Sequence, residues 1–133
     1  MPMQFRFAYF TPRYEETLEF YRVGLGFPVV EAWDRSADDR GTIFAAAAGM
    51  VEVLSVPAGA SDHVFDARPP QGAFMVIEVD DVDARYRDAR ARGLAVQEAL
   101  EDRAWGHRAF CIRDPNGLTL YLFSERRAVS RSG

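Results

Sequence analysis

The most constraining feature of this sequence is that one order of secondary-structure patterns occurs twice, about 68 residues apart. In the first half, strand-like alternation over residues 5–10 precedes a helical stretch in which Tyr14, Leu18, Tyr21 and Val23 share a face. Three further strand-like runs follow the glycines that end this helix, at residues 27–33, 42–47 and 50–56. The first half therefore predicts the order strand, helix, strand, strand, strand.

The second half repeats this order. A strand at 73–79 leads into a helix at 82–92, with Asp80 or Asp81 as the capping residue. The remaining strands are expected at 94–98, 107–113 and 118–123.

Turn residues separate the last two strands of each half. Asp114-Pro115-Asn116-Gly117 places Pro and Gly where a hairpin turn needs them, and Ala48-Gly49 is the expected tight turn in the first half. The polar segment 34–40 is expected to be a solvated connection between two strands, or the rim of a site.

The duplicated order predicts an α+β protein made of two tandem βαβββ modules. We expect the first module at 1–56, a linker at 57–72, the second module at 73–125 and a frayed tail at 126–133. Each sheet would carry its helix on one face, which leaves the other face open. That open face is where a ligand could bind. His63 and Phe65 lie in the expected linker, which could instead be a lid.

Composition narrows the functional classes. The 133 residues carry a net charge of −4, and the arginines are spread along the chain without a basic stripe, so we expect no nucleic-acid partner. The longest apolar run, 43–48, is too short to span a membrane, and no signal-peptide pattern is present, so a cytoplasmic protein is expected. Cys111, the single cysteine, is expected in a strand interior as a small apolar residue.

Several short motifs occur in a specific order along the chain. They are Phe20-Tyr21, Gly24-Leu25-Gly26-Phe27, Val79-Asp80-Asp81-Val82-Asp83, Trp105-Gly106-His107-Arg108-Ala109-Phe110 and Asp114-Pro115-Asn116-Gly117. The ordered set resembles the vicinal oxygen chelate superfamily of glyoxalases, bleomycin resistance proteins and dioxygenases over nearly the whole chain. The resemblance implies that the two modules form a cup-shaped, mostly antiparallel sheet with the helices on its outer face. It also implies a homodimer.

The resemblance further implies four positions on the cup floor where metal-dependent members carry ligands. In this chain they hold Arg6, Glu52, Phe74 and Tyr121. Guanidinium and phenyl groups cannot ligate a divalent cation, and a phenol is a poor ligand for one. Only Glu52 suits a metal, so we expect no metal and no cofactor.

These positions suggest a ligand site of another kind. Arg6 and Glu52 could form an ion pair that is either structural or holds a polar group of a ligand. The resemblance places Trp33, Phe44, Trp105 and Phe110 near Phe74 and Tyr121, either as ligand contacts or as ordinary core.

The leading hypothesis is a small-molecule-binding protein that sequesters an aromatic or amphipathic compound without turnover. The first alternative is an enzyme, either metal-dependent with atypical ligands or metal-free with Glu52 as base and Tyr121 or His107 as acid. A further alternative is an accessory module that supplies only an interface.

Overall fold

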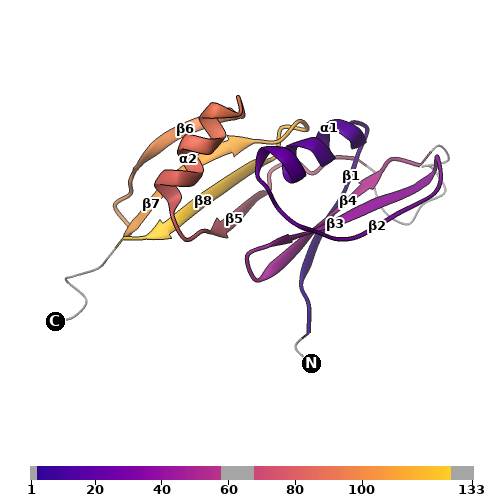
Figure 1. Ribbon diagram of the computed structural model, residues 1–133, viewed down its shortest axis with the longest axis horizontal. Coiled ribbons are helices and arrows are strands. Elements are labelled where there is room, and N and C mark those ends of the chain that lie inside the picture. The colour runs from indigo at the N-terminus through magenta and orange to yellow at the C-terminus, as the bar shows by residue number, and fades with distance from the viewer. Residues whose placement is uncertain (1–2, 58–67, 127–133) are drawn as a thin grey trace. The chain divides into compact units, whose positions relative to one another are not determined.

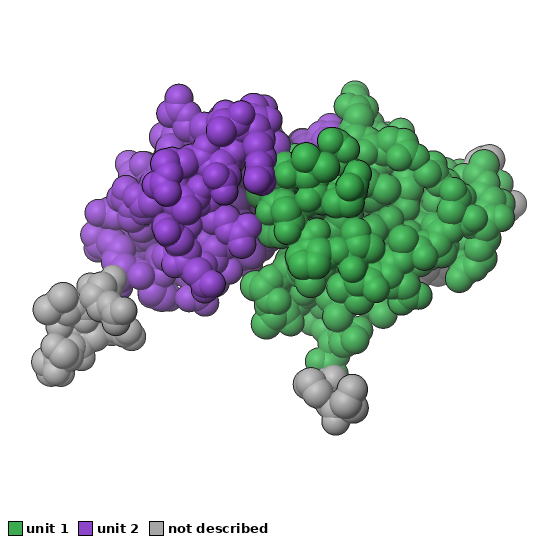
Figure 2. Space-filling model, in the orientation of Figure 1, with its two compact units in different colours: residues 1–72 green, residues 73–133 purple. Residues whose placement is uncertain are grey.

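A computed structural model describes residues 3–57 and 68–126 of the chain. These fall into two compact units, residues 1–72 and 73–133 (Figure 2). Residues 58–67 of the expected linker, with His63 and Phe65, and residues 127–133 of the expected tail lie outside the described residues.

The first unit is a four-stranded sheet with a helical segment on one face (Figure 1). Its elements are β1 (Arg6–Thr11), α1 (Tyr14–Glu19), the π-helical turn η1 (Phe20–Gly24), β2 (Val29–Ser36), β3 (Asp39–Ala46) and β4 (Gly49–Ser55). The strand order is β1-β4-β3-β2, with β1 parallel to β4 and the other neighbours antiparallel.

The second unit has the same plan (Figure 1). Its elements are β5 (Phe74–Glu78), α2 (Val82–Ala91), β6 (Ala95–Asp102), β7 (His107–Arg113) and β8 (Thr119–Glu125). The order β5-β8-β7-β6 reproduces that of the first unit, again with a parallel β5–β8 pair. The predicted α+β architecture of two βαβββ modules is therefore confirmed.

Alternation along the strands gives each sheet a buried face beneath its helix. In the first module Tyr21 is fully buried, its ring centroid 5.4 Å from that of Phe44, and its hydroxyl is hydrogen-bonded to Tyr9. In the second module Phe110 is fully buried and packs edge-on against Tyr86 of α2, with ring centroids 5.0 Å apart. Large apolar groups removed from water in this way are the main source of stability in both modules.

One expectation about the first helix is wrong. The shared face was expected to include Val23, but its side chain is 46% exposed. After Glu19 the helix widens into a π-turn in which Leu25 N–H donates to Phe20 O, five residues back. This wider turn rotates the later residues relative to a regular helix, so Phe20, Tyr21 and Gly24 face inward instead.

Two turns also differ from expectation. Segment 34–40 is largely strand, because β2 extends to Ser36 and β3 begins at Asp39, and Arg35 pairs with Asp39 across this hairpin. In the next hairpin, the turn residues are Ala47 and Ala48, while Gly49 already belongs to β4. Ala47 adopts the left-handed conformation with φ 53° that glycine would favour.

Other local predictions are confirmed. The Asp81 side chain accepts a hydrogen bond from Ala84 N–H at 3.1 Å and so caps α2. In the β7–β8 turn, Asp114 Oδ1 accepts from the backbone of Asn116 and of Leu118, and Gly117 supplies a left-handed φ of 87°. Cys111 lies inside β7 and is buried, and this burial raises the pKa of its thiol.

No helix among residues 3–57 and 68–126 is long and apolar enough to cross a membrane.

Candidate functional site

The face of each sheet that lies opposite its helix carries the candidate site, and strand register decides which residues it contains. In the first module Ala8 and Ile43 both pair with Glu52, so the three side chains point to the same side. In the second module Val76 and Cys111 both pair with Tyr121. Glu52 and Tyr121 therefore hold equivalent positions on the two open faces.

Arg6 and Glu52 form the expected ion pair on the open face of the first module. Arg6 Nη1 donates to Glu52 Oε1 at 3.2 Å. The Arg6 side chain is 41% exposed and that of Glu52 is 17% exposed. A partly buried carboxylate thus has a counter-charge, while the guanidinium keeps surface available for a further acceptor.

Trp33 lies on the same open face, at its β2 edge. A Cβ added to Gly41 on β3 would come within 2.2 Å of the Trp33 ring, so the indole lies directly against the β3 backbone. The indole N–H donates to Asp39 Oδ1 at 3.0 Å. Gly41 is the residue that permits this packing, because any side chain there would displace the ring.

The open face of the second module is more apolar. Phe74 and Val76 on β5 are 61% and 55% exposed, although both are large apolar residues. Tyr121 on the neighbouring strand is half-buried and presents its ring beside Val76. Exposed apolar side chains grouped on one face are typical of binding surfaces.

The polar groups of this face converge on one hydroxyl. Trp105 Nε1–H donates to Tyr121 Oη at 3.0 Å, and His107 Nδ1 lies 2.9 Å from the same oxygen. The His107 ring stacks on Phe123 at 3.9 Å between centroids, and its Nε2 lies 3.6 Å from Glu125 Oε2. Four aromatic rings, those of Trp105, His107, Tyr121 and Phe123, are thereby linked to one another around the phenol oxygen.

The sequence suggested His107 only as an alternative acid to Tyr121 and did not predict the contact between them. The available signal was strand alternation: His107 begins an antiparallel strand whose partner carries Tyr121, Phe123 and Glu125 on one face. The exact register between the two strands was needed to bring the imidazole to the phenol, and the register depends on the length of the β7–β8 turn.

Two expected site residues lie in the module cores. Phe44 and Phe110 are both fully buried beneath their helices, so neither ring has surface with which to touch a ligand. Of the two alternatives left open for these rings, the structure shows core packing. The other expected residues, Arg6, Trp33, Glu52, Phe74, Trp105 and Tyr121, have exposed or half-buried side chains on their own module.

The four positions where the family resemblance implies metal ligands do not fit a divalent cation. Arg6 is a cation already paired with Glu52, Phe74 has no lone pair, and the Tyr121 hydroxyl is bonded to Trp105 and His107. Among residues 3–57 and 68–126, no three His, Cys, Asp or Glu side chains gather closely enough to hold a metal ion.

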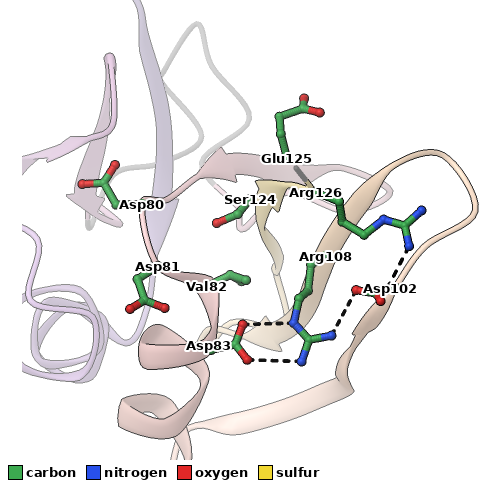
Figure 3. A pocket seen from close by; sticks show the side chains of 9 residues that line it. All are labelled: Asp80, Asp81, Val82, Asp83, Asp102, Arg108, Ser124, Glu125 and Arg126. Atoms are coloured by element: carbon green, nitrogen blue, oxygen red, sulfur yellow. Dashed lines mark hydrogen bonds and ion pairs between the residues drawn. The ribbon is translucent and has the colours of Figure 1, made fainter. Parts of the chain in front are cut away.

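A pocket lies on the second module at the start of α2 (Figure 3). Its volume is about 360 Å³, and its lining is mostly charged. Arg108 spans it, donating to both carboxylate oxygens of Asp83 and to Asp102. The hydrogen bonds from the Arg108 guanidinium hold the pKa of Asp83 below its usual range. Arg108 thus ties the first turn of α2 to the sheet through Asp83 and Asp102.

Two four-stranded βαβββ modules in one chain define the class of protein. The sequence profile of the Glyoxalase/Bleomycin resistance protein/Dioxygenase superfamily matches residues 4–122, and the chain belongs to this superfamily.

Solved structures agree on the fold. TioX from Micromonospora sp. ML1 is 18% identical with a TM-score of 0.77, over 93% of this chain and 99% of that one. A superfamily member from Sphaerobacter thermophilus DSM 20745 is 24% identical with a TM-score of 0.72, over 94% and 98%. A lactoylglutathione lyase from Agrobacterium tumefaciens is 17% identical with a TM-score of 0.69, over 93% and 94%. No curated protein matches the sequence.

Proposed function

We propose that the protein binds flat, largely apolar organic molecules on an open sheet face and sequesters them without chemical turnover. The observation that carries this proposal is the open face of the second module. There Phe74 and Val76 expose most of their apolar surface beside the ring of Tyr121. Rings bind flat molecules well, because they offer large apolar contact and offset stacking.

Each open face also carries polar groups that would orient a ligand bound there. On the second module Tyr121 Oη is fixed in place by Trp105 and His107, and on the first module the Arg6 guanidinium is positioned by Glu52. A few fixed polar groups in an apolar surrounding are the usual composition of a small-molecule site. Arg6 suits an anionic or carbonyl group of the ligand, since a guanidinium only donates hydrogen bonds.

We also propose that the protein is a homodimer. Large apolar side chains outside the proposed ligand face are also exposed, including Phe5 at 72%, just before β1, and Val30 at 51% on β2. Association through such surfaces removes them from water. Light scattering at micromolar concentration tests this directly, and a monomer there contradicts it.

A thermal-shift screen against flat aromatic compounds tests the main proposal, with divalent metals screened in parallel. Binding to the folded state raises the melting temperature by mass action. The matched control is Phe74→Ala, which removes exposed contact area without opening the core. An aromatic hit that is weakened by Phe74→Ala supports the proposal. Stabilisation by a metal alone, with no aromatic hit, contradicts it.

An enzyme is the second candidate, and the contact between His107 and Tyr121 favours it. An imidazole nitrogen 2.9 Å from a phenol can exchange a proton with it, as acid–base catalysis requires. Glu52, the proposed base, is engaged by Arg6 instead of being free. Elemental analysis of the purified protein tests the metal-dependent version of this candidate. Conversion of a bound compound that is lost in Tyr121→Phe would support the metal-free version.

A further inference from the structure

We propose that Tyr121 presents a hydrogen-bond acceptor to the ligand, so that the site selects flat aromatic molecules bearing an N–H or O–H donor at their edge. This inference rests on the proposed function, because it specifies the ligand of that same face. It follows from the direction of each hydrogen bond around the Tyr121 hydroxyl.

The first step concerns Trp105. An indole nitrogen can only donate, so at 3.0 Å the Tyr121 oxygen accepts this bond with one lone pair. The hydroxyl proton of Tyr121 must therefore point elsewhere.

The second step concerns His107. Its Nδ1 is 2.9 Å from the Tyr121 oxygen, and its Nε2 faces the Glu125 carboxylate at 3.6 Å. A carboxylate is an acceptor and attracts the imidazole proton to Nε2. Nδ1 of the neutral ring then carries a lone pair, and Tyr121 donates its only proton to it.

The third step concerns what is left for a ligand. With its proton committed to His107 and one lone pair committed to Trp105, the half-buried Tyr121 hydroxyl has only acceptor capacity remaining. A ligand group beside it must donate. An ether or carbonyl oxygen in that place would meet a lone pair and leave its own lone pair unsatisfied, which lowers affinity.

The proton position is testable without any ligand. Imidazole ¹⁵N spectra at pH 8 distinguish the two neutral tautomers of histidine. Because the chain has two histidines, the His107→Phe variant shows which ¹⁵N signal belongs to His107. We expect the proton of His107 on Nε2. A proton on Nδ1 would reverse the bond to Tyr121 and overturn the inference, whatever the protein binds.

The ligand class is tested with three bicyclic probes of one shape: indole, which donates; benzofuran, which only accepts; and indene, which does neither. Each is titrated at pH 8 while the two tryptophan indole N–H signals are followed by NMR, with Trp33 as the internal reference for Trp105. We expect indole to bind about five-fold more tightly than benzofuran, the factor provided by one hydrogen bond between uncharged groups.

Two variants identify the responsible group. In Tyr121→Phe the three probes should bind equally, because the acceptor is gone. In His107→Phe the stack on Phe123 is kept while the hydroxyl proton of Tyr121 is released, so the preference for indole should disappear.

The outcomes separate the inference from the proposed function. Equal binding of all probes to the wild type, or tighter binding of benzofuran, overturns the donor preference and leaves the aromatic site standing. If no probe moves the Trp105 signal, the proposed function fails and the ligand class fails with it.

Discussion

The two modules have the same arrangement on their helix-facing side and different chemistry on their open side. On the helix side of the first module, Arg40 pairs with Glu15 at the start of α1 and with Asp34 on β2. The second module repeats this arrangement 68 residues later with Arg108, Asp83 and Asp102. In each case a β-strand arginine ties the first turn of the helix to the edge of the sheet.

On the open side, equivalent positions carry unlike groups. The first module places Arg6 and Glu52 where the second module places Phe74 and Tyr121. One face has an ion pair, and the other has apolar rings around a hydrogen-bonded cluster centred on the Tyr121 hydroxyl. On the helix-facing side, packing against the helix restricts which residues each module can carry. On the open side the residues can differ without unfolding either module. The difference supports the proposal that ligand specificity resides on the open side.

The largest effects are expected beneath the helices. Phe44→Ala and Phe110→Ala each remove a fully buried ring, and we expect each to lower the free energy of unfolding by about 3–5 kcal/mol. Phe74→Ala on the open face should change it by less than about 0.5 kcal/mol. Denaturant titration of the three variants gives these values. If Phe74→Ala were as costly as the core variants, the open face would be part of a core.

The next effect concerns the two pairs of equivalent open-face positions, Arg6 with Phe74 and Glu52 with Tyr121. The triple variant Arg6→His, Phe74→His and Tyr121→Glu would surround Glu52 with metal ligands if the four positions share one site. In that case the variant should gain about 2.7 kcal/mol of stability from Zn²⁺ or Mn²⁺ at a hundredfold excess over its Kd. Metal-dependent thermal unfolding measures this, with the wild type as control.

If the triple variant folds but its thermal stability does not change with Zn²⁺, Mn²⁺ or Ni²⁺, these side chains do not converge on one site. The residue-by-residue transfer of positions from the family would then be wrong. The metal-free variant is expected to be less stable than the wild type, because histidine and glutamate replace two rings and lack partners until a metal binds.

Short-range patterns predicted much of the fold. The two βαβββ orders, the Asp81 cap and the Asp114–Gly117 turn each depend on residues near in sequence, and they were correct. The Arg6–Glu52 pair was also predicted, because alternation on β1 and β4 aims both side chains at the open face.

Features that depend on tertiary packing were missed. The π-turn after Glu19 places Tyr21 in the core at the expense of regular helix geometry, and propensities do not show this. Polar residues 34–40 form strands because cross-strand pairs such as Arg35–Asp39 compensate for their composition. The cluster of Trp105, His107 and Tyr121 required a register that spacing alone did not fix.

Smaller effects should distinguish the charged open face from the uncharged one. Glu52→Gln and Tyr121→Phe should each cost about 1 kcal/mol or less, since one removes a partly exposed ion pair and the other a hydrogen-bonded hydroxyl. Only the cost of Glu52→Gln should shrink in 1 M salt, because salt screens charges. Urea titrations at low and high salt measure both. Equal salt dependence of the two variants would contradict the contrast between the faces.

The smallest effect tests the arginine pairing on the helix side. The hydrogen-bonded guanidinium of Arg108 holds the pKa of Asp83 below its usual range, so the folded state releases this proton more readily than the unfolded state. Asp83 therefore stabilises the fold above the ordinary carboxyl pKa of about 4, and this contribution is lost as pH falls through the lowered folded value. We expect Asp83→Asn to reduce thermal stability at pH 6 and to have a progressively smaller effect as the pH falls below the ordinary carboxyl pKa. In an Arg108→Gln background the same substitution should give a weaker pH dependence, whereas an unchanged profile there would show that Arg108 is not the cause.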